Sequence, residues 1–159
     1  MSRLTAFWTD RHGASMVETA IMLPVVMLLG MGAVEFSRGL QQYHEIVTGV
    51  ADAARYLSHT ADPATSATYA KQIAVYGQIG GSTKRVSWWS VGDVTVTIRT
   101  IANTRNATTG VRTYRGPDPI KIVKVSTTAT YPGFGFLKFL GFNSGLSFGV
   151  YQEDRVIGN

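Results

Sequence analysis

Glu18 is the side chain whose surroundings most need an explanation, because it lies near the start of a long apolar stretch. No other formally charged residue occurs between Gly13 and Val34. A helix rises about 1.5 Å per residue, so residues 14–34 are long enough to cross the roughly 30 Å hydrocarbon layer of a bilayer. A carboxylate in such a span is costly in lipid, and it therefore usually has a function and a partner.

No residue pattern typical of an enzyme can be placed elsewhere in the chain. The histidines lack the close spacing of metal ligands, even where acidic residues follow them. They are His12, His44 and His59. Because the chain also lacks a Gly-rich phosphate loop and a nucleophile elbow, we expect no catalytic residue, no cofactor and no metal site.

The composition sets further bounds. The 159 residues allow one domain of ordinary size beside a membrane anchor. The absence of Cys excludes disulfides, thiolate metal ligands and Cys nucleophiles. Residues 1–13 are too polar for the core of a signal peptide. They carry Arg3 and Arg11 against Asp10, and basic residues before a first span favour a cytoplasmic N-terminus. The bulk of the chain is then expected outside.

The net charge of +5 is mild, but basic residues gather between positions 99 and 124 against a single acid, Asp118. They are Arg99, Arg105, Arg112, Arg115, Lys121 and Lys124. A nucleic-acid surface would interleave such charges with stacking aromatics, and Tyr114 alone does not supply them. We interpret the region first as a solvated loop and strand face. A ligand, if one binds, would be an anionic glycan, a lipid head group or an acidic partner subunit.

The helix is expected to continue beyond the apolar stretch, as one element from Ala14 to Ser58. Apolar residues recur along it at intervals of four and three, which indicates one buried face. They are Phe36, Leu40, Tyr43, Val47, Val50, Ala54 and Leu57. Pro24 removes the N–H that would bond to the carbonyl of Ala20, and this predicts a bend in the span.

The rest of the chain reads as a small α+β domain. Turn residues, alternation and capping signals predict its elements. They are a short helix capped by Asp62-Pro63 and stopped by Gly77, a hairpin of Val86–Val91 with Val94–Ile101 around Gly92-Asp93, an exposed loop over 103–119, and paired strands at Ile120–Thr130 and Leu146–Ile157. The fold class is thus α+β, with a long N-terminal helix whose outer half packs on a small antiparallel sheet.

A loop of unusual apolarity follows the first of these paired strands. It holds Phe134, Phe136, Phe139, Leu140 and Phe142. So many apolar side chains need a cover, and three remain open: the domain's own core, a sibling subunit or the outer leaflet of the membrane. We favour the core, because a small sheet under a helix often needs an apolar lid.

Three motifs together resemble the TadE-like family, the minor pseudopilins of the tight-adherence (Tad/Flp) pilus. They are Gly-Ala-Ser-Met-Val-Glu-Thr-Ala-Ile-Met-Leu-Pro at 13–24, Val-Glu-Phe-Ser-Arg at 34–38 and Ala-Asp-Ala-Ala-Arg-Tyr at 51–56. The chain departs from the family pattern at Thr19, where the pattern has Phe, at Ser37, where it has Gly, and at Asp52-Ala53, where it has Glu-Gly. The fairly specific part of the match is residues 13–60.

The resemblance implies a pilin-like fold and a defined set of roles. A prepilin peptidase would cut between Gly13 and Ala14, where a residue of minimal size precedes the bond. Glu18 would then face the new amino group of Ala14 on a neighbouring subunit and set the subunit's register. The implied partners are the peptidase, the pilus assembly platform, the major pilin, sibling minor pseudopilins and membrane lipid, without nucleic acid. The subunit would prime assembly, cap the tip or enter the fibre.

The expected organisation is therefore a cytoplasmic leader at 1–13, a long helix at 14–60 with its transmembrane half at 14–34, and an extracytoplasmic domain at 61–159. The protein would span the bacterial inner membrane once, with its C-terminal domain in the periplasm. Two rivals stay open. One is a permanently anchored periplasmic protein that binds an anionic glycan or envelope polymer through residues 99–124. The other is a secreted enzyme with an atypical signal.

Overall fold

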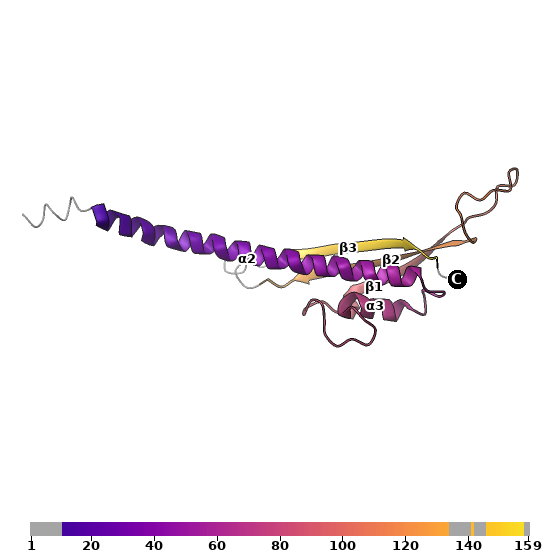
Figure 1. Ribbon diagram of the computed structural model, residues 1–159, viewed down its shortest axis with the longest axis horizontal. Coiled ribbons are helices and arrows are strands. Elements are labelled where there is room, and N and C mark those ends of the chain that lie inside the picture. Colours follow the sequence, from indigo (N-terminus) through magenta and orange to yellow (C-terminus); the bar gives the residue numbers. More distant parts are fainter. Residues whose placement is uncertain (1–10, 134–140, 142–145, 158–159) are drawn as a thin grey trace, which may run out of the picture. The chain divides into compact units, whose positions relative to one another are not determined.

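The computed structural model describes residues 11–133, 141 and 146–157 (Figure 1). The chain divides into two compact units, which we call unit 1 (Met1–Arg38 with Gly133–Asn143) and unit 2 (Gly39–Pro132 with Ser144–Asn159). The Phe side chains of the apolar loop, Phe134 to Phe142, lie outside the described residues.

One helix, α2, runs from Arg11 to Ser58 and belongs to both units. The sequence predicts its last residue correctly, and its first turn begins three residues before the expected Ala14. Pro24 is accommodated inside it. At the C-terminal end, the Ser58 hydroxyl donates to the carbonyl of Arg55 at 2.8 Å, so one of the orphan carbonyls of the last turn is satisfied.

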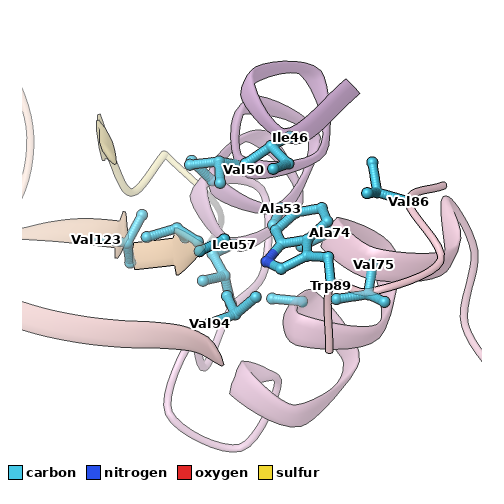
Figure 2. Packing of buried hydrophobic residues seen from close by; sticks show 14 of the residues in the cluster. Ile46, Val50, Ala53, Leu57, Ala74, Val75, Val86, Trp89, Val94 and Val123 are labelled. Atoms are coloured by element: carbon cyan, nitrogen blue, oxygen red, sulfur yellow. The ribbon is translucent and has the colours of Figure 1, made fainter. Parts of the chain in front are cut away.

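Unit 2 has its core where α2 meets a second helix, α3 (Ala67–Tyr76), and the sheet. Trp89 is fully buried, and Figure 2 shows its ring among side chains from α2 and α3. The members of this cluster that come from the two helices are Ile46, Val50, Ala53, Ala54, Leu57, Ala70, Ala74 and Val75. Truncation of a buried aromatic of this size typically costs about 3–5 kcal/mol, so the ring is a major support of the unit.

The predicted apolar face of the helix is right only in its second half. Val50, Ala54 and Leu57 are buried, whereas Phe36 is 66% and Leu40 44% exposed. Ile46 and Ala53, which the pattern did not select, are buried instead. Two neighbouring lines of residues along a helix can both have intervals of four and three. Spacing alone therefore does not show which of the two lines the rest of the domain covers.

Helix α3 ends as expected and begins later than expected. Gly77 adopts a φ of 77° and its N–H bonds to the carbonyl of Ile73 at 2.8 Å. Asp62 does not cap this helix, because Ser66 precedes Ala67 at its start. Asp62 instead caps the preceding turn, where its carboxylate accepts hydrogen bonds from the Thr65 hydroxyl and the Ala64 N–H. These two bonds hold the pKa of the Asp62 carboxyl below its ordinary value.

The sheet is a three-stranded antiparallel meander of β1 (Val94–Ile101), β2 (Ile120–Tyr131) and β3 (Leu146–Arg155), in that order. Thr127 at its centre pairs with Val94 on one side and Val150 on the other. Alternation along β2 sends Val123, Val125 and Ala129 into the core. The α+β fold class and these strands are confirmed.

The predicted hairpin before β1 is wrong. Val91–Asp93 is a short 3-10 helix, η1, and residues 86–90 form no strand. The Asp93 carboxylate accepts hydrogen bonds from the Ser90 N–H at 2.9 Å and the Ser90 hydroxyl at 2.8 Å. These bonds fold residues 90–93 into a tight turn. Val86 and Trp89 are therefore buried in the core and do not pair with a neighbouring strand.

Two glycines of α2 give a matched test of this packing. A Cβ at Gly49 would clash with the carbonyl oxygen of Ala74 and lie 3.0 Å from the Trp89 ring, whereas one at Gly39 would lie 3.7 Å from Tyr131. Gly49→Ala should therefore destabilise unit 2 by about 1–3 kcal/mol. Gly39→Ala should be neutral or stabilise it by up to about 1 kcal/mol, through helix propensity. Denaturant unfolding followed by tryptophan fluorescence measures both, and equal effects at the two sites would contradict the packing.

Candidate functional site

The N-terminal part of α2 exposes a nearly continuous apolar surface. Its large apolar side chains are between 39% and 78% exposed. They are Met16, Val17, Ile21, Met22, Leu23, Val25, Val26, Met27, Leu28, Leu29, Met31 and Val34. Exposed apolar surface costs about 25 cal/mol per Å² in water, and a patch of this extent marks a surface that something covers.

Within the part of the chain that the structure describes, α2 is the one helix that is long and apolar enough to cross a membrane. Apart from the carbonyl of Ala20, which Pro24 leaves without an N–H partner, the backbone groups in the interior of this helix are bonded within it, as a span in lipid requires. The Thr19 hydroxyl follows the same rule and donates to the carbonyl of Ser15 at 2.9 Å. A single N-terminal helix of this kind indicates single-pass membrane anchoring.

Glu18 is exposed on this apolar surface. It follows Ala14 by four residues, so the two positions are neighbours on one face of the helix, one turn apart. Chemically, the position is suited to hold a cation at a fixed height along the helix.

Gly13 lies in the first turn of α2, and a Cβ placed on it would meet nothing within 4 Å. The side of the backbone on which a Cβ would stand is therefore open. The first four N–H groups of a helix have no partner within it, so this turn is the part of α2 that opens most readily. A glycine in a helix also costs about 0.5–1 kcal/mol relative to alanine, which favours opening at this point.

Pro24 leaves the carbonyl of Ala20 without its N–H partner in α2. A bend at this position stays a prediction. Farther along, Glu35 is buried, with 5% of its surface exposed. Sequence reasoning missed this burial, although a signal was present: steps of four, three and four residues lead from Glu35 through Gly39 and Gln42 to Ile46, a buried core residue.

In unit 2, an ion pair and hydrogen bonds join the segment after α3, residues 85–89, to α2 and to the sheet. Arg85 pairs with Asp52 at 2.6 Å, and the Trp88 Nε1–H donates to the Gln42 side chain at 2.8 Å. Trp89 donates from Nε1 to the Thr127 hydroxyl at 3.0 Å, which in turn donates to the carbonyl of Asp93 at 2.9 Å. Each of these groups is used in holding the fold together, and none of these contacts joins a nucleophile to a base.

His44 and His59 belong to no cluster of metal-binding side chains among the described residues. No group of three His, Cys, Asp or Glu residues able to hold a metal ion occurs among the residues with a described position. The ring of His44 packs edge-on against Tyr43, with 6.0 Å between the ring centroids. His59 lies just beyond Ser58, the last residue of α2, as expected for a residue near the helix end.

The basic region is not one surface. Arg99 and Lys124 lie on the sheet and share one carboxylate, Glu153, at 3.1 Å and 3.5 Å. Lys124 also lies over the Tyr151 ring, 4.5 Å from its centroid. Exposed pairs of this kind contribute about 0–1 kcal/mol to stability, but they do lower the local positive charge. The remaining arginines belong to the loop between β1 and β2.

Comparison with known proteins adds one match. No curated protein and no solved structure matches the chain. The family model described as TadE-like protein matches residues 13–55. The matched segment begins at Gly13, includes Glu18 and Pro24, and ends within the part of α2 that packs in unit 2. Over this segment the chain is similar to TadE-like proteins, a family associated with the Tad pilus system.

Proposed function

We propose that the protein is a minor pseudopilin-like structural subunit for assembly of a Tad/Flp-type adhesive pilus, and that a prepilin peptidase processes it. The observation that carries this proposal is the exposed apolar helix that holds one carboxylate, five residues after a glycine at which the TadE-like match begins. We assign the chain no enzymatic activity, cofactor or metal.

Residues 14–34 insert in the bacterial inner membrane, so that the apolar side chains exposed on α2 are covered by lipid. The basic residues Arg3 and Arg11 hold the N-terminus in the cytoplasm, and residues 61–159 form the periplasmic domain. In this arrangement the membrane is the store from which subunits are drawn into the fibre.

Processing hydrolyses the peptide bond between Gly13 and Ala14. Water adds to the carbonyl carbon of Gly13, and the bond to the Ala14 nitrogen breaks. The products are a leader of residues 1–13 and a new α-amino group on Ala14. Support for this step comes from the exposed backbone at Gly13 and from its place in the first turn of α2, where helical hydrogen bonds are fewest.

The new amino group gives Glu18 a partner. In lipid, a carboxylate and an ammonium are each costly alone, and pairing compensates both. A subunit entering the assembly therefore stops where its own Glu18 meets the Ala14 amine of its neighbour, which sets its axial register. The neighbours are the major pilin and sibling minor pseudopilins, and the pilus assembly platform brings them together.

Membrane anchoring can be tested with two added charges. A lysine at the centre of a span costs about 2.5–3.5 kcal/mol on insertion scales. Met27→Lys with Leu28→Lys should therefore release the chain into the supernatant on alkaline carbonate extraction. Tyr69→Lys with Ile79→Lys adds the same charges at exposed positions of unit 2, and this control should stay in the pellet. Retention of the first variant would contradict the span.

Processing can be tested by intact mass after co-expression with a cognate prepilin peptidase. The wild-type chain should lose residues 1–13 and begin at Ala14. Gly13→Asp should remain uncut, because it places a charged side chain at the scissile bond. Ser2→Asp adds the same charge away from the bond and should be cut normally. A mature wild-type form that still begins at Met1 would favour the permanently anchored binding protein, and one that begins beyond Val34 would favour a secreted enzyme.

The register role of Glu18 can be tested with Glu18→Val as the only copy of the protein. Insertion and cleavage should persist, because the span becomes more apolar and the cut site is unchanged. Removing one partner of a buried ion pair costs about 3–5 kcal/mol, so pilus formation should fall by roughly two to four orders of magnitude. Glu45→Val, at an exposed position of the same helix, is the control. Normal piliation by Glu18→Val, counted by electron microscopy, would rule out the pairing.

A further inference from the structure

The loop between β1 and β2, residues 102–119, is closed by a buried asparagine; we call it the arginine loop. Asn103 is 2% exposed. Its side-chain amide donates to the carbonyls of Tyr114 at 2.8 Å and Pro117 at 3.1 Å, and its oxygen accepts from the Tyr114 N–H at 3.0 Å. The Asn103 N–H donates to the Asp118 carboxylate at 2.8 Å. One residue therefore joins both ends of the loop.

The tip of the arginine loop is ordered as well. Arg105 and Arg112 form a bridge across it, and the Asn106 side chain accepts the N–H groups of Thr108 and Thr109 at 2.9 Å and 3.0 Å. Gly110 takes the left-handed conformation, with φ of 66°, that closes the turn. A loop held in this way has already lost much of the conformational entropy that binding would otherwise remove.

The charges of this loop are offered to solvent. Arg105 and Arg115 are exposed, and their guanidinium groups have no hydrogen-bond or ion-pair partner among the described residues. Arg112 is half-buried and donates to the carbonyl of Gly116 at 2.7 Å, so it holds the loop together. The single acid, Asp118, is occupied by Asn103. The loop therefore has a net positive charge that its own residues do not neutralise.

The arginine loop lies at one end of unit 2. Gly39, where α2 enters the unit, is beside Tyr131 at one end of β2. The loop leaves from the other end of β2. There the carbonyl of Lys121 accepts the Val156 N–H at 2.9 Å, and the carbonyl of Ser58 accepts the Ile157 N–H at 2.7 Å. The stretch of α2 from Gly39 to Ser58 rises about 29 Å between these ends. The loop thus projects from the end of the unit opposite to the entry of α2.

We propose that the arginine loop docks on an acidic surface of a second protein. Its composition favours a protein over a polysaccharide: it contains three arginines, no lysine and an exposed tyrosine, Tyr114. Arg and Tyr are enriched and Lys is depleted in protein interfaces, whereas a purely coulombic surface uses Lys and Arg alike. Exposed Val111 adds an apolar contact. A second copy of this chain is a poor partner, because each copy has a formal net charge of +5.

Binding by the purified full-length chain in detergent micelles tests the proposal. One probe is a synthetic peptide in which glutamates alternate with leucine and tyrosine, and the other is an alginate oligomer, a carboxylated polysaccharide. The peptide should bind, and Arg105→Gln with Arg115→Gln should weaken it about tenfold, which corresponds to about 1.4 kcal/mol. Arg105→Lys with Arg115→Lys keeps the charge but loses the bidentate geometry, and it should weaken binding several-fold. Tyr114→Ser should weaken peptide binding as well.

The control removes two positive charges elsewhere, by Arg55→Gln with Lys71→Gln, and should leave peptide affinity unchanged. All variants should keep the wild-type melting temperature, because the altered side chains take no part in the hydrogen bonds of the fold. Equal weakening by the control would overturn the proposal, since attraction would then follow net charge alone. Alginate binding that survives Arg→Lys, without peptide binding, would assign the loop to a polysaccharide. Absence of peptide binding to the wild-type chain would also overturn the proposal that the loop docks on a protein. Cleavage at Gly13 is unaffected in every case, so the proposed function is tested separately.

Discussion

One continuous helix must satisfy two different surroundings, and the rest of the structure depends on how α2 does so. Between Met16 and Val34, apart from Glu18 and Thr19, its large side chains are apolar on every face and exposed. From Ile46 to Leu57 only one face is apolar and buried. A uniform apolar surface suits lipid, and an apolar stripe suits a protein core. The change from one pattern to the other occurs around Glu35, the first charged residue after Glu18.

The stripe in unit 2 is narrow because small residues line it. Gly49 lets the carbonyl of Ala74 and the Trp89 ring come close to α2, and Ala53, Ala54 and Ala70 are fully buried. Close approach of two helices allows one large ring to fill the space between them and the sheet. The Trp89 N–H then needs a partner inside the core, and Thr127 on the central strand provides it. Trp89, Gly49 and Thr127 thus belong to one packing arrangement.

The sequence predicted the parts of this fold that depend on local pattern. Alternation of valines placed β1 and β2, glycine placed the end of α3, and the lack of charge placed the apolar helix. The failures came where one side chain decided between local alternatives. Asp93 bonds back to Ser90 and turns an expected hairpin into η1, and Asp62 caps a turn rather than α3. Composition does not reveal which backbone N–H a carboxylate will reach.

For the candidate site, Glu18 and Pro24 stand out in the sequence because an uncharged helix makes each exception visible, and Gly13 stands out through the resemblance to the TadE-like family. The roles of these three residues stay predictions. The sequence analysis did not foresee the burial of Glu35, although the spacing that leads to Ile46 was a signal for it. It did not foresee the role of Asn103 either, since a polar residue in a polar stretch carries no signal. The order within the arginine loop arises from bonds between residues 103 and 114–118, and such contacts across a loop are invisible to periodicity.

The bond from the Ile157 N–H to the carbonyl of Ser58 has a mechanical consequence. The end of β3 is pinned to the end of α2, while the helix enters the unit at the opposite end, beside Tyr131. A tensile force applied along α2 at Gly39 therefore loads in shear the buried cluster that α2 shares with α3 and the sheet. Peeling would instead break the contacts of this cluster one after another. Rupture under load is governed by the rate of unfolding, and a geometry loaded in shear keeps that rate low. Unit 2 is thus built to resist being pulled by its own helix.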